Sequence, residues 1–306
     1  MAAPMRSTDF RSVVEPILNE VFDGVYDQRA DEWSRVFREE TGIPRAYHEE
    51  PVAYGFGAAP ELPDGTAVTY QQGGILFLQR YLYKVYGLAF ALTKILVEDG
   101  DHIRIGQTYA RHLAQSLVET KEILCANVLN FAFNSSTQYA GGDGVSLINT
   151  AHPAAIGTFS NQLSSSAVLS QTSVEQMLIQ IRQAVDSTQR KIRLVPRQLI
   201  VAPGNIFQAE VVLKSILRSG NANNDINPIK SIGLLDEGAV VLSRLTSTTA
   251  WFVQTDAPEG FKLMMRRKLE KTMEGDFETD SMRYKATERY AVGYTDSRCA
   301  FGTPGV

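Results

Sequence analysis

The apolar positions of this 306-residue chain follow two different periods, and each period predicts a different kind of element. Over residues 8–27 the apolar side chains recur every three or four positions, which predicts an amphipathic helix. The same spacing runs through residues 102–133, with no proline and no glycine after Gly106. A helix of that length would be about 45 Å long, which is unusual in a compact enzyme.

An alternating pattern marks other parts of the chain as β-structure. Residues 282–294 place apolar and aromatic side chains on one face and Arg283, Lys285, Thr287 and Arg289 on the other, which predicts a half-exposed strand. Residues 38–67 are broken by prolines and glycines and predict an irregular arm or extended loop. Aromatic and β-branched residues follow, so we interpret residues 50–90 as a long, projecting β-hairpin.

Residues 172–258, which follow a polar loop over 154–171, predict a small α/β subdomain. It opens with a helix over 172–186, in which Thr172 and Glu175 have the spacing of a capping box. The elements expected after it are a buried strand over 197–203, a helix over 205–220 capped by Asn205 and stopped by Gly220, and a pair of strands over 238–245 and 250–256.

Composition narrows the class of protein. Hydrophobic content of 44% and charged content of 21% are ordinary for a soluble globular protein, and a net charge of -4 argues against strong binding to nucleic acid or to an anionic membrane. Cys125 and Cys299 have no partner pattern, which favours a reducing compartment over a disulfide scaffold or thiolate metal site. The N-terminus lacks a signal-peptide pattern, and the apolar window over 86–97 is too short to span a bilayer. We therefore expect a soluble protein made inside the cell.

The stretch GGDGVSLINTAHP, residues 141–153, brings Asp143, Ser146 and His152 together in sequence and raises the possibility of a hydrolase site. No G-x-S-x-G motif accompanies them, and the proline after His152 favours an extended turn. We interpret the stretch as a glycine-rich turn that feeds a short strand, GVSLIN, rather than as a catalytic site.

The sequence evidence for other kinds of functional site is equally weak. Gly141, Gly142 and Gly144 follow a helix and lack the Lys-Ser/Thr of a phosphate loop. The histidines, His48, His102, His112 and His152, lack ligand spacing. The acidic run MEGDFETD (273–280), with Glu274, Asp276, Glu278 and Asp280, lacks calcium-loop spacing and reads as a solvated turn. The basic run RRK (266–268) indicates a solvent-exposed strand face or an inter-subunit salt bridge rather than a nucleic-acid patch. We expect no catalytic residue, cofactor or metal.

What remains unusual is the expected shape. An arm and a projecting hairpin have no core to pack on in a monomer. They make physical sense if they lie across neighbouring subunits of an oligomer.

The chain resembles the major capsid (major head) proteins of tailed bacteriophages, and most closely the Mu-type major head subunit group. Seven runs carry the resemblance and cover most of residues 30–303 in the same order. They are YGFGAAPELPDGTAVTYQ, ETKEILCANVLNFAF, GGDGVSLINTAHP, RQLIVAPGNIFQAEVVLKS, NANNDINPIKSIGLLDEG, AWFVQTDAPEGFK and LEKTMEGDFETDSMRYKATERYAVGYTD.

The resemblance implies an α+β fold of the Hong Kong 97 type. The parts expected are an N-terminal arm (1–48), an extended loop over an adjacent subunit (49–90), a peripheral domain (91–165) with a spine helix (102–133), an axial domain (166–258), further peripheral strands (259–295) and a C-terminal tail (296–306).

The implied function is self-assembly as pentamers and hexamers into an icosahedral head around double-stranded DNA, in the host bacterial cytoplasm. The expected partners are a portal, a scaffolding protein and a decoration protein, with no membrane and no sequence-specific DNA binding. Because a scaffolding segment of the kind some relatives carry is not seen ahead of the arm, scaffolding would come from a separate protein or an earlier cleavage. Two rivals are a cellular nanocompartment shell that captures a cargo enzyme, and a hydrolase using Ser146 and His152.

Some relatives join subunits through a Lys–Asn isopeptide bond. Lys84 lies in the loop region, but no motif supports such a bond, and we predict that none forms. Dissociated particles should run as a single monomer band on a denaturing gel. A ladder of high-mass species would contradict this prediction.

Overall fold

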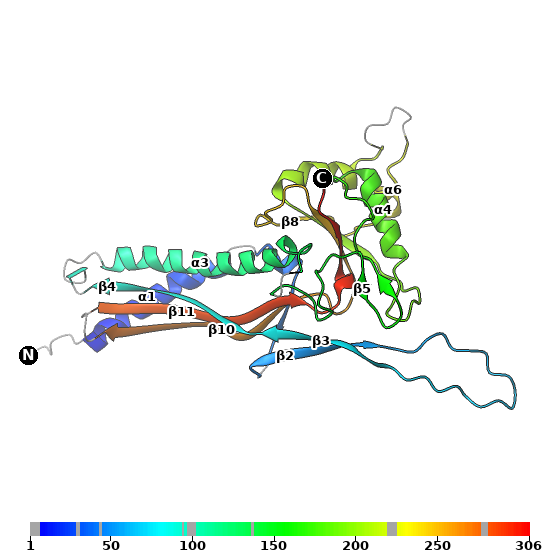
Figure 1. Ribbon diagram of the computed structural model, residues 1–306. Helices are drawn as coiled ribbons and strands as arrows, with labels where there is room; N and C mark the ends of the chain where they lie inside the picture. The colour runs from blue at the N-terminus through cyan, green and yellow to red at the C-terminus, as the bar shows by residue number, and fades with distance from the viewer. Residues whose placement is uncertain are drawn as a thin grey trace, which may run out of the picture.

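The computed structural model describes residues 7–28, 31–42, 45–93, 95–96, 102–135, 138–218, 225–276 and 281–306. An elongated body of helices and long strands leads into an α/β unit, and a hairpin runs below that unit and beyond it (Figure 1). None of the helices in these ranges combines the length and apolarity that a membrane crossing needs.

A long sheet forms the elongated body. Its strands lie in the order β1 (Arg38–Thr41), β10 (Phe261–Asp276), β11 (Ser281–Tyr294) and β4 (Lys84–Thr93). β11 is antiparallel to both β10 and β4, whereas β1 runs parallel to β10 and covers only its residues Lys262–Met265. β11 is therefore the central strand of the body.

The alternation expected along β11 is confirmed. Tyr284, Ala286 and Tyr290 are buried, while Arg283 and Lys285 are exposed. The charged Glu288 also lies on the buried face, 1% exposed. Its Oε1 accepts a hydrogen bond of 2.6 Å from the Tyr26 hydroxyl, and its Oε2 lies 3.1 Å from Lys121 Nζ. A buried ion pair thus joins the sheet to its helices, which the sequence pattern did not reveal.

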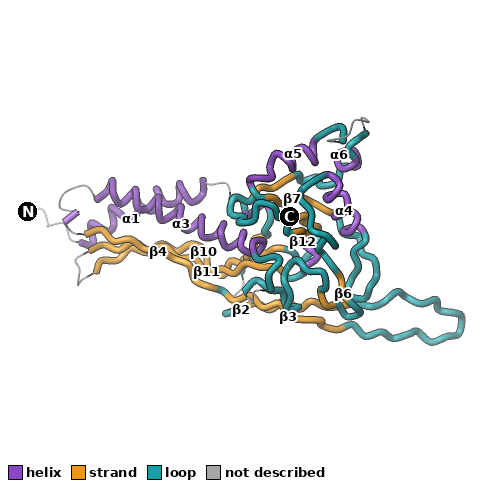
Figure 2. Tube along the Cα trace, turned by 45° about the horizontal axis from the view of Figure 1, so that its top comes forward, coloured by secondary structure: helices purple, strands orange, loops and turns teal. Residues whose placement is uncertain are grey.

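Helices α1 (Ser7–Gln28) and α3 (His102–Asn130) pack together along this sheet (Figures 1 and 2). Helix α1 confirms the prediction for residues 8–27. Helix α3 ends three residues before the predicted 133. Its last turn tightens, because Ala132 N donates to Leu129 O, and the Ala132 carbonyl accepts from Ile148 N. The chain thereby turns back at a point where the spacing of apolar residues alone predicts that the helix continues.

The projecting hairpin is shorter than predicted. It pairs β2 (Tyr47–Tyr54) with β3 (Gly74–Leu82), and residues 55–73 form its tip without regular secondary structure. The interpretation of 50–90 as one hairpin is wrong at its C-terminal end, because β4 leaves the hairpin and pairs with β11 in the long sheet. The region 38–67, expected to be irregular, also contains β1 and β2, which gain their hydrogen bonds from strands distant in sequence.

The α/β unit is built on a second sheet with the order β12 (Ala300–Thr303), β9 (Trp251–Thr255), β7 (Pro196–Val201) and β8 (Ala239–Val241). Helices α4 (Gln171–Arg182), α5 (Ile206–Lys214) and α6 (Pro228–Ile232) contribute to the apolar cluster on one face, with Leu199 and Val201 of β7. The predicted strand over 197–203 is confirmed. The two strands predicted over 238–245 and 250–256 are also confirmed, as β8 and β9, and they lie on opposite sides of β7.

One of the two helix caps predicted in this unit is wrong. The cap of α4 is Ser170, whose side chain accepts from Ser173 N while Ser173 Oγ accepts from Ser170 N. Asn205 does occupy the cap position of α5, but its side chain makes no cap bond and instead donates to Thr248 O, and α5 ends at Lys214. Gly220, the predicted stop, lies outside the described residues. Hydroxyl pairs three residues apart can replace the Ser/Thr–Glu pair that the motif requires.

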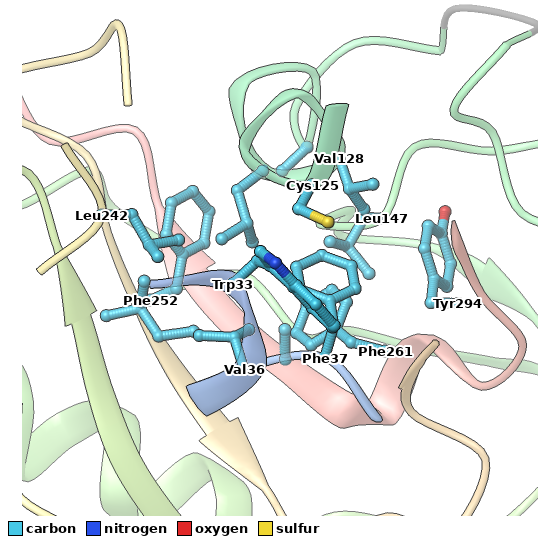
Figure 3. Packing of buried hydrophobic residues seen from close by; sticks show 14 of the residues in the cluster. Trp33, Val36, Phe37, Cys125, Val128, Leu147, Leu242, Phe252, Phe261 and Tyr294 are labelled. Atoms are coloured by element: carbon cyan, nitrogen blue, oxygen red, sulfur yellow. The ribbon is translucent and has the colours of Figure 1, made fainter. Parts of the chain in front are cut away.

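The other face of the second sheet packs on the elongated body and forms the core at their junction (Figure 3). Trp33, in the short 3₁₀ helix η1 (Trp33–Arg35), lies among Phe252 of β9, Phe261 of β10 and Val128 of α3. The remaining short elements are β5 (His152–Pro153), β6 (Thr158–Phe159) and the 3₁₀ helices η2 (Pro203–Asn205) and η3 (Ser297–Cys299).

We predict that Trp33→Ala lowers the free energy of unfolding by about 3–5 kcal/mol, because it removes a large side chain that is 5% exposed from this core. Denaturant unfolding of the unassembled subunit measures the effect. Tyr70→Ala, at a position 95% exposed, is the matched control and should change stability by less than about 0.5 kcal/mol. Equal effects of the two substitutions would contradict the prediction.

Candidate functional site

The histidine and aspartate of the stretch 141–153 do come together. His152 Nδ1 lies 2.7 Å from Asp143 Oδ2, and the two side chains are 0% and 3% exposed. The His152 ring also stacks on Phe159 of the paired strand β6, with ring centroids 4.8 Å apart. Arg298 Cζ lies 3.9 Å from the centroid of the same Phe159 ring. The pair is therefore buried in a packed cluster.

Asn161 organises this cluster, although nothing in the polar loop around it predicts this role. Its Nδ2 donates to backbone carbonyl oxygens at 2.7–3.0 Å, those of Leu147, Ser297 and Ala300. These bonds fix the orientation of the amide, so that Asn161 Oδ1 faces His152 Nε2 at 3.1 Å and Asn149 N at 2.8 Å. Both ring nitrogens of His152 thus face oxygen atoms in a structural network.

Ser146 takes no part in that network as a nucleophile. A triad needs the serine hydroxyl on the histidine nitrogen opposite the carboxylate, and Asn161 occupies that position. The Ser146 Oγ instead donates to Ile148 O at 3.0 Å and accepts from Asn149 Nδ2 at 3.2 Å, and the residue is 3% exposed. The predicted strand GVSLIN is also absent: residues 144–149 form bends, and Ile148 N donates to the carbonyl of Ala132, just beyond the end of α3.

The glycines of this stretch serve packing. A Cβ on Gly142 would lie 2.8 Å from the carbonyl oxygen of Leu78 on β3, so the turn approaches the hairpin strand closely. Gly144 has a φ of +78°, in the region that favours glycine. These contacts explain the glycines without a phosphate ligand.

In the part of the chain that the structure describes, no three His, Cys, Asp or Glu side chains are grouped to hold a metal ion. Glu274 and Asp276 lie on β10, while Glu278 and Asp280 of the predicted acidic turn fall outside the described residues. Within the basic run, Arg267 Nη2 donates to Thr287 Oγ1 on the neighbouring strand at 3.1 Å.

The hairpin is the part of the described surface that most clearly indicates a function. Large apolar side chains along it are exposed to solvent; they include Phe56 (58%), Leu62 (55%), Val68 (63%), Tyr70 (95%), Ile75 (63%) and Leu78 (51%). A two-stranded ribbon has no core of its own, and a row of exposed apolar side chains marks an interaction surface. The hairpin is therefore built to be covered by another molecule.

A buried lysine anchors the hairpin to the long sheet. Lys262 of β10 has a side chain 4% exposed, and its Nζ lies 2.7 and 2.8 Å from the two carboxylate oxygens of Glu50 on β2. Lys262 Nζ also donates to Glu259, and Glu50 accepts from the Thr295 hydroxyl. The Tyr81 hydroxyl on β3 is 2.6 Å from Thr295 Oγ1. Both strands of the hairpin are thus hydrogen-bonded to Thr295.

Burial alone would raise the pKa of Glu50, but hydrogen bonds from Lys262 and Thr295 hold this pKa below its ordinary value of 4.5. Burial would likewise lower the pKa of Lys262, and the bonds to Glu259 and Glu50 raise it above 10.5 instead. The facing charges also include Glu40, 3.6 Å from Lys262 Nζ, and His48, 3.3 Å from Glu50 Oε1. Both partners of the anchor are therefore charged across the neutral range.

A protein that uses Asp143, His152 and Asn161 in structural bonds and presents apolar side chains on a projecting hairpin fits the class of proteins that assemble from copies. The chain belongs to the phage capsid protein family, whose model matches residues 81–301, most of its length. No curated protein matches the chain.

Several solved structures are similar in fold. A virus-like particle from Pyrococcus furiosus shares 10% identity over 94% of this chain and 98% of its own, with a TM-score of 0.54. The capsid of cyanophage P-SCSP1u shares 11% over 89% and 86%, with a TM-score of 0.57. A structure of Microbacterium phage Oxtober96 shares 10% over 90% and 91%, with a TM-score of 0.54. The predicted α+β fold of the Hong Kong 97 type is confirmed.

The protein is a capsid protein of the phage virion. It is a structural protein and not an enzyme, as expected from the sequence. The geometry around Ser146 agrees, because the arrangement that a serine hydrolase requires is replaced by bonds to Ile148 and Asn149.

We predict that acid loosens the anchor of the hairpin. The pKa of Glu50 is lower in the folded chain than in the unfolded chain, so its contribution to stability is complete above pH 4.5 and is lost as the pH falls through the folded value. Limited proteolysis within residues 55–73 of the unassembled subunit should therefore accelerate below about pH 4.5, measured with an acid-active protease and corrected for its own pH profile.

Glu50→Gln is the matched control, because it keeps the shape of the side chain and removes its titration. Cleavage in this variant should already be fast at pH 7 and should not accelerate further in acid. If the wild-type chain is cleaved at the same rate as the variant at every pH, the prediction is contradicted.

Proposed function

We propose that the head closes because each copy lays its hairpin over a neighbouring subunit. The observation that supports this most strongly is the row of exposed apolar side chains from Phe56 to Leu78. Covering them removes apolar area from water at about 25 cal/mol for each Å². Since each copy both gives and receives a hairpin, modest contacts sum over the shell.

We assign the parts of the chain to roles in the shell on the same basis. The extended loop is residues 47–82, because β4 belongs to the long sheet. The peripheral domain contains α3 and the sheet of β4, β10 and β11. The axial domain, 166–258, gathers around the centres of pentamers and hexamers and is completed by β12 from the C-terminal tail, which pairs with β9.

The shell encloses double-stranded DNA without reading its sequence. A net charge of -4 gives the chain no general attraction for phosphates, which suits a wall from which DNA must later leave. We further propose a separate scaffolding protein, a portal and a decoration protein as partners. The seven runs of sequence quoted above support a place in the Mu-type major head subunit group.

A cellular nanocompartment shell is the second candidate, because the fold is shared with the virus-like particle from Pyrococcus furiosus as well as with a phage capsid. The match to the phage capsid protein family favours the phage head. The contents of purified particles separate the two: packaged DNA supports the phage head, and a captured enzyme supports the nanocompartment.

We predict that replacing residues 55–73 by the dipeptide Asn-Gly leaves a folded subunit that no longer forms closed shells. Tyr54 and Gly74 face each other across the hairpin, so a two-residue turn can join them without disturbing β2 and β3. Circular dichroism checks the fold, and negative-stain electron microscopy of the expressed chain, with scaffold supplied if needed, checks assembly.

The full-length chain is the control and should give shells, tubes or capsomer rings. A full-length chain that stays monomeric under all these conditions would contradict the proposed function. Closed shells from the shortened chain at full yield would contradict only the role given to the hairpin.

A further inference from the structure

The α/β unit carries an apolar groove on its outer surface, between α4 and α6. The groove has a volume of about 380 Å³ and is lined by Leu178, Ile179, Ile232 and Leu234 among others. Ile179 is 57% exposed and Ile232 is 68% exposed. Neighbouring apolar side chains that are this exposed mark a surface that another molecule covers.

Helix α5 of the same unit carries an apolar ridge. Phe207 is 82% exposed and Val211 is 40% exposed, and the four-residue spacing places them on the same side of the helix. The opposite side of α5 is buried through Ala209, Val212 and Leu213. Solvent exposure of Phe207 is therefore a property of a well-packed helix and not of a loose one.

The ridge and the groove lie on different helices of the same unit. α5, which carries the ridge, packs against β8 and contacts α6, one wall of the groove, whereas α4, the other wall, packs against β12. Figure 2 shows α4 and α5 on different sides of the unit. Because one sheet holds both helices, a copy cannot place its own ridge in its own groove.

We infer that Phe207 and Val211 of one copy dock into the groove between α4 and α6 of the next copy around a pentamer or hexamer. The inference rests on the proposed function, in which this unit gathers around the centre of each ring. A contact between two different surfaces is heterologous, and repeated rotation closes it into a ring. The occupant of the groove is therefore a second copy of this chain.

Charge complementarity supports this occupant. Glu175 and Arg182 line the groove seven residues apart, two turns along α4. On α5, Glu210 and Lys214 flank Val211, and their side chains are 43% and 71% exposed. The groove and the ridge thus each carry one charge of either sign beside apolar residues. On docking, Glu210 and Lys214 can replace their ion pair within α5 by ion pairs with charged residues of the neighbouring copy. Such pairs between copies fix the register of the contact.

The decisive experiment is cross-linking in assembled particles of the double variant Phe207→Cys/Ile232→Cys. Treatment with a short bis-maleimide should give, on a denaturing gel, a ladder that ends at five or six copies. Each single variant is a matched control and should stay monomeric, because the two surfaces meet each other and not themselves. The native Cys125 and Cys299 are buried and do not contribute.

A second pair of variants tests the energy of the contact. Phe207→Asp should reduce the yield of closed particles about tenfold or more, as expected when a buried anchor of an interface is replaced by a charge. Phe207→Leu should retain most of the yield. Both variants should fold, since the side chain is exposed in the single subunit.

Double-variant particles that form without a ladder would overturn the inference and leave the proposed function intact. So would an equal particle yield from Phe207→Asp and wild type. If the double variant forms no particles, the comparison of Phe207→Asp with Phe207→Leu decides. Failure of the wild-type chain to assemble would instead overturn the proposed function.

Discussion

The structure depends on the core where the second sheet meets the elongated body. β7 and β9 are buried on both faces: Leu199 and Trp251 point to the helices of the α/β unit, and Ile200 and Phe252 point to the body. Phe252 shares this core with Trp33 and Phe261 (Figure 3). Because this core is continuous across the junction, the parts that contact other copies are held on one body.

The polar networks extend this rigidity to the surfaces that assemble. Asn161 bonds the stretch 141–153 to the chain around Ser297 and Ala300, and Lys262 ties the hairpin to β10. These groups are costly to bury unless they are bonded, so each fixes a local geometry that apolar packing would leave less defined. Residue types associated with catalysis, such as His152 and Asp143, are used here to hold the chain in place.

The sequence predicted well whatever depends on local periodicity. The helix over 8–27 and the alternation along β11 both follow from patterns within a few residues. It failed where partners distant in sequence decide, as when β4 joins β11 rather than the hairpin. Residue Asn161 could not be found, because an asparagine in a polar loop has no local sign of the distant carbonyls it will meet.

The short reach of β1 has a consequence for a particle in which many copies are crowded together. β1 covers Lys262–Met265, so the rest of β10, from Arg266 to Asp276, is left on that side without a paired strand in the described sheet. Such an edge can recruit another strand, and the charges spread along it, among them Lys268, Glu270 and Glu274, oppose that recruitment. The cost of removing these charged side chains from water protects the subunits from joining into sheets before they are built into a head.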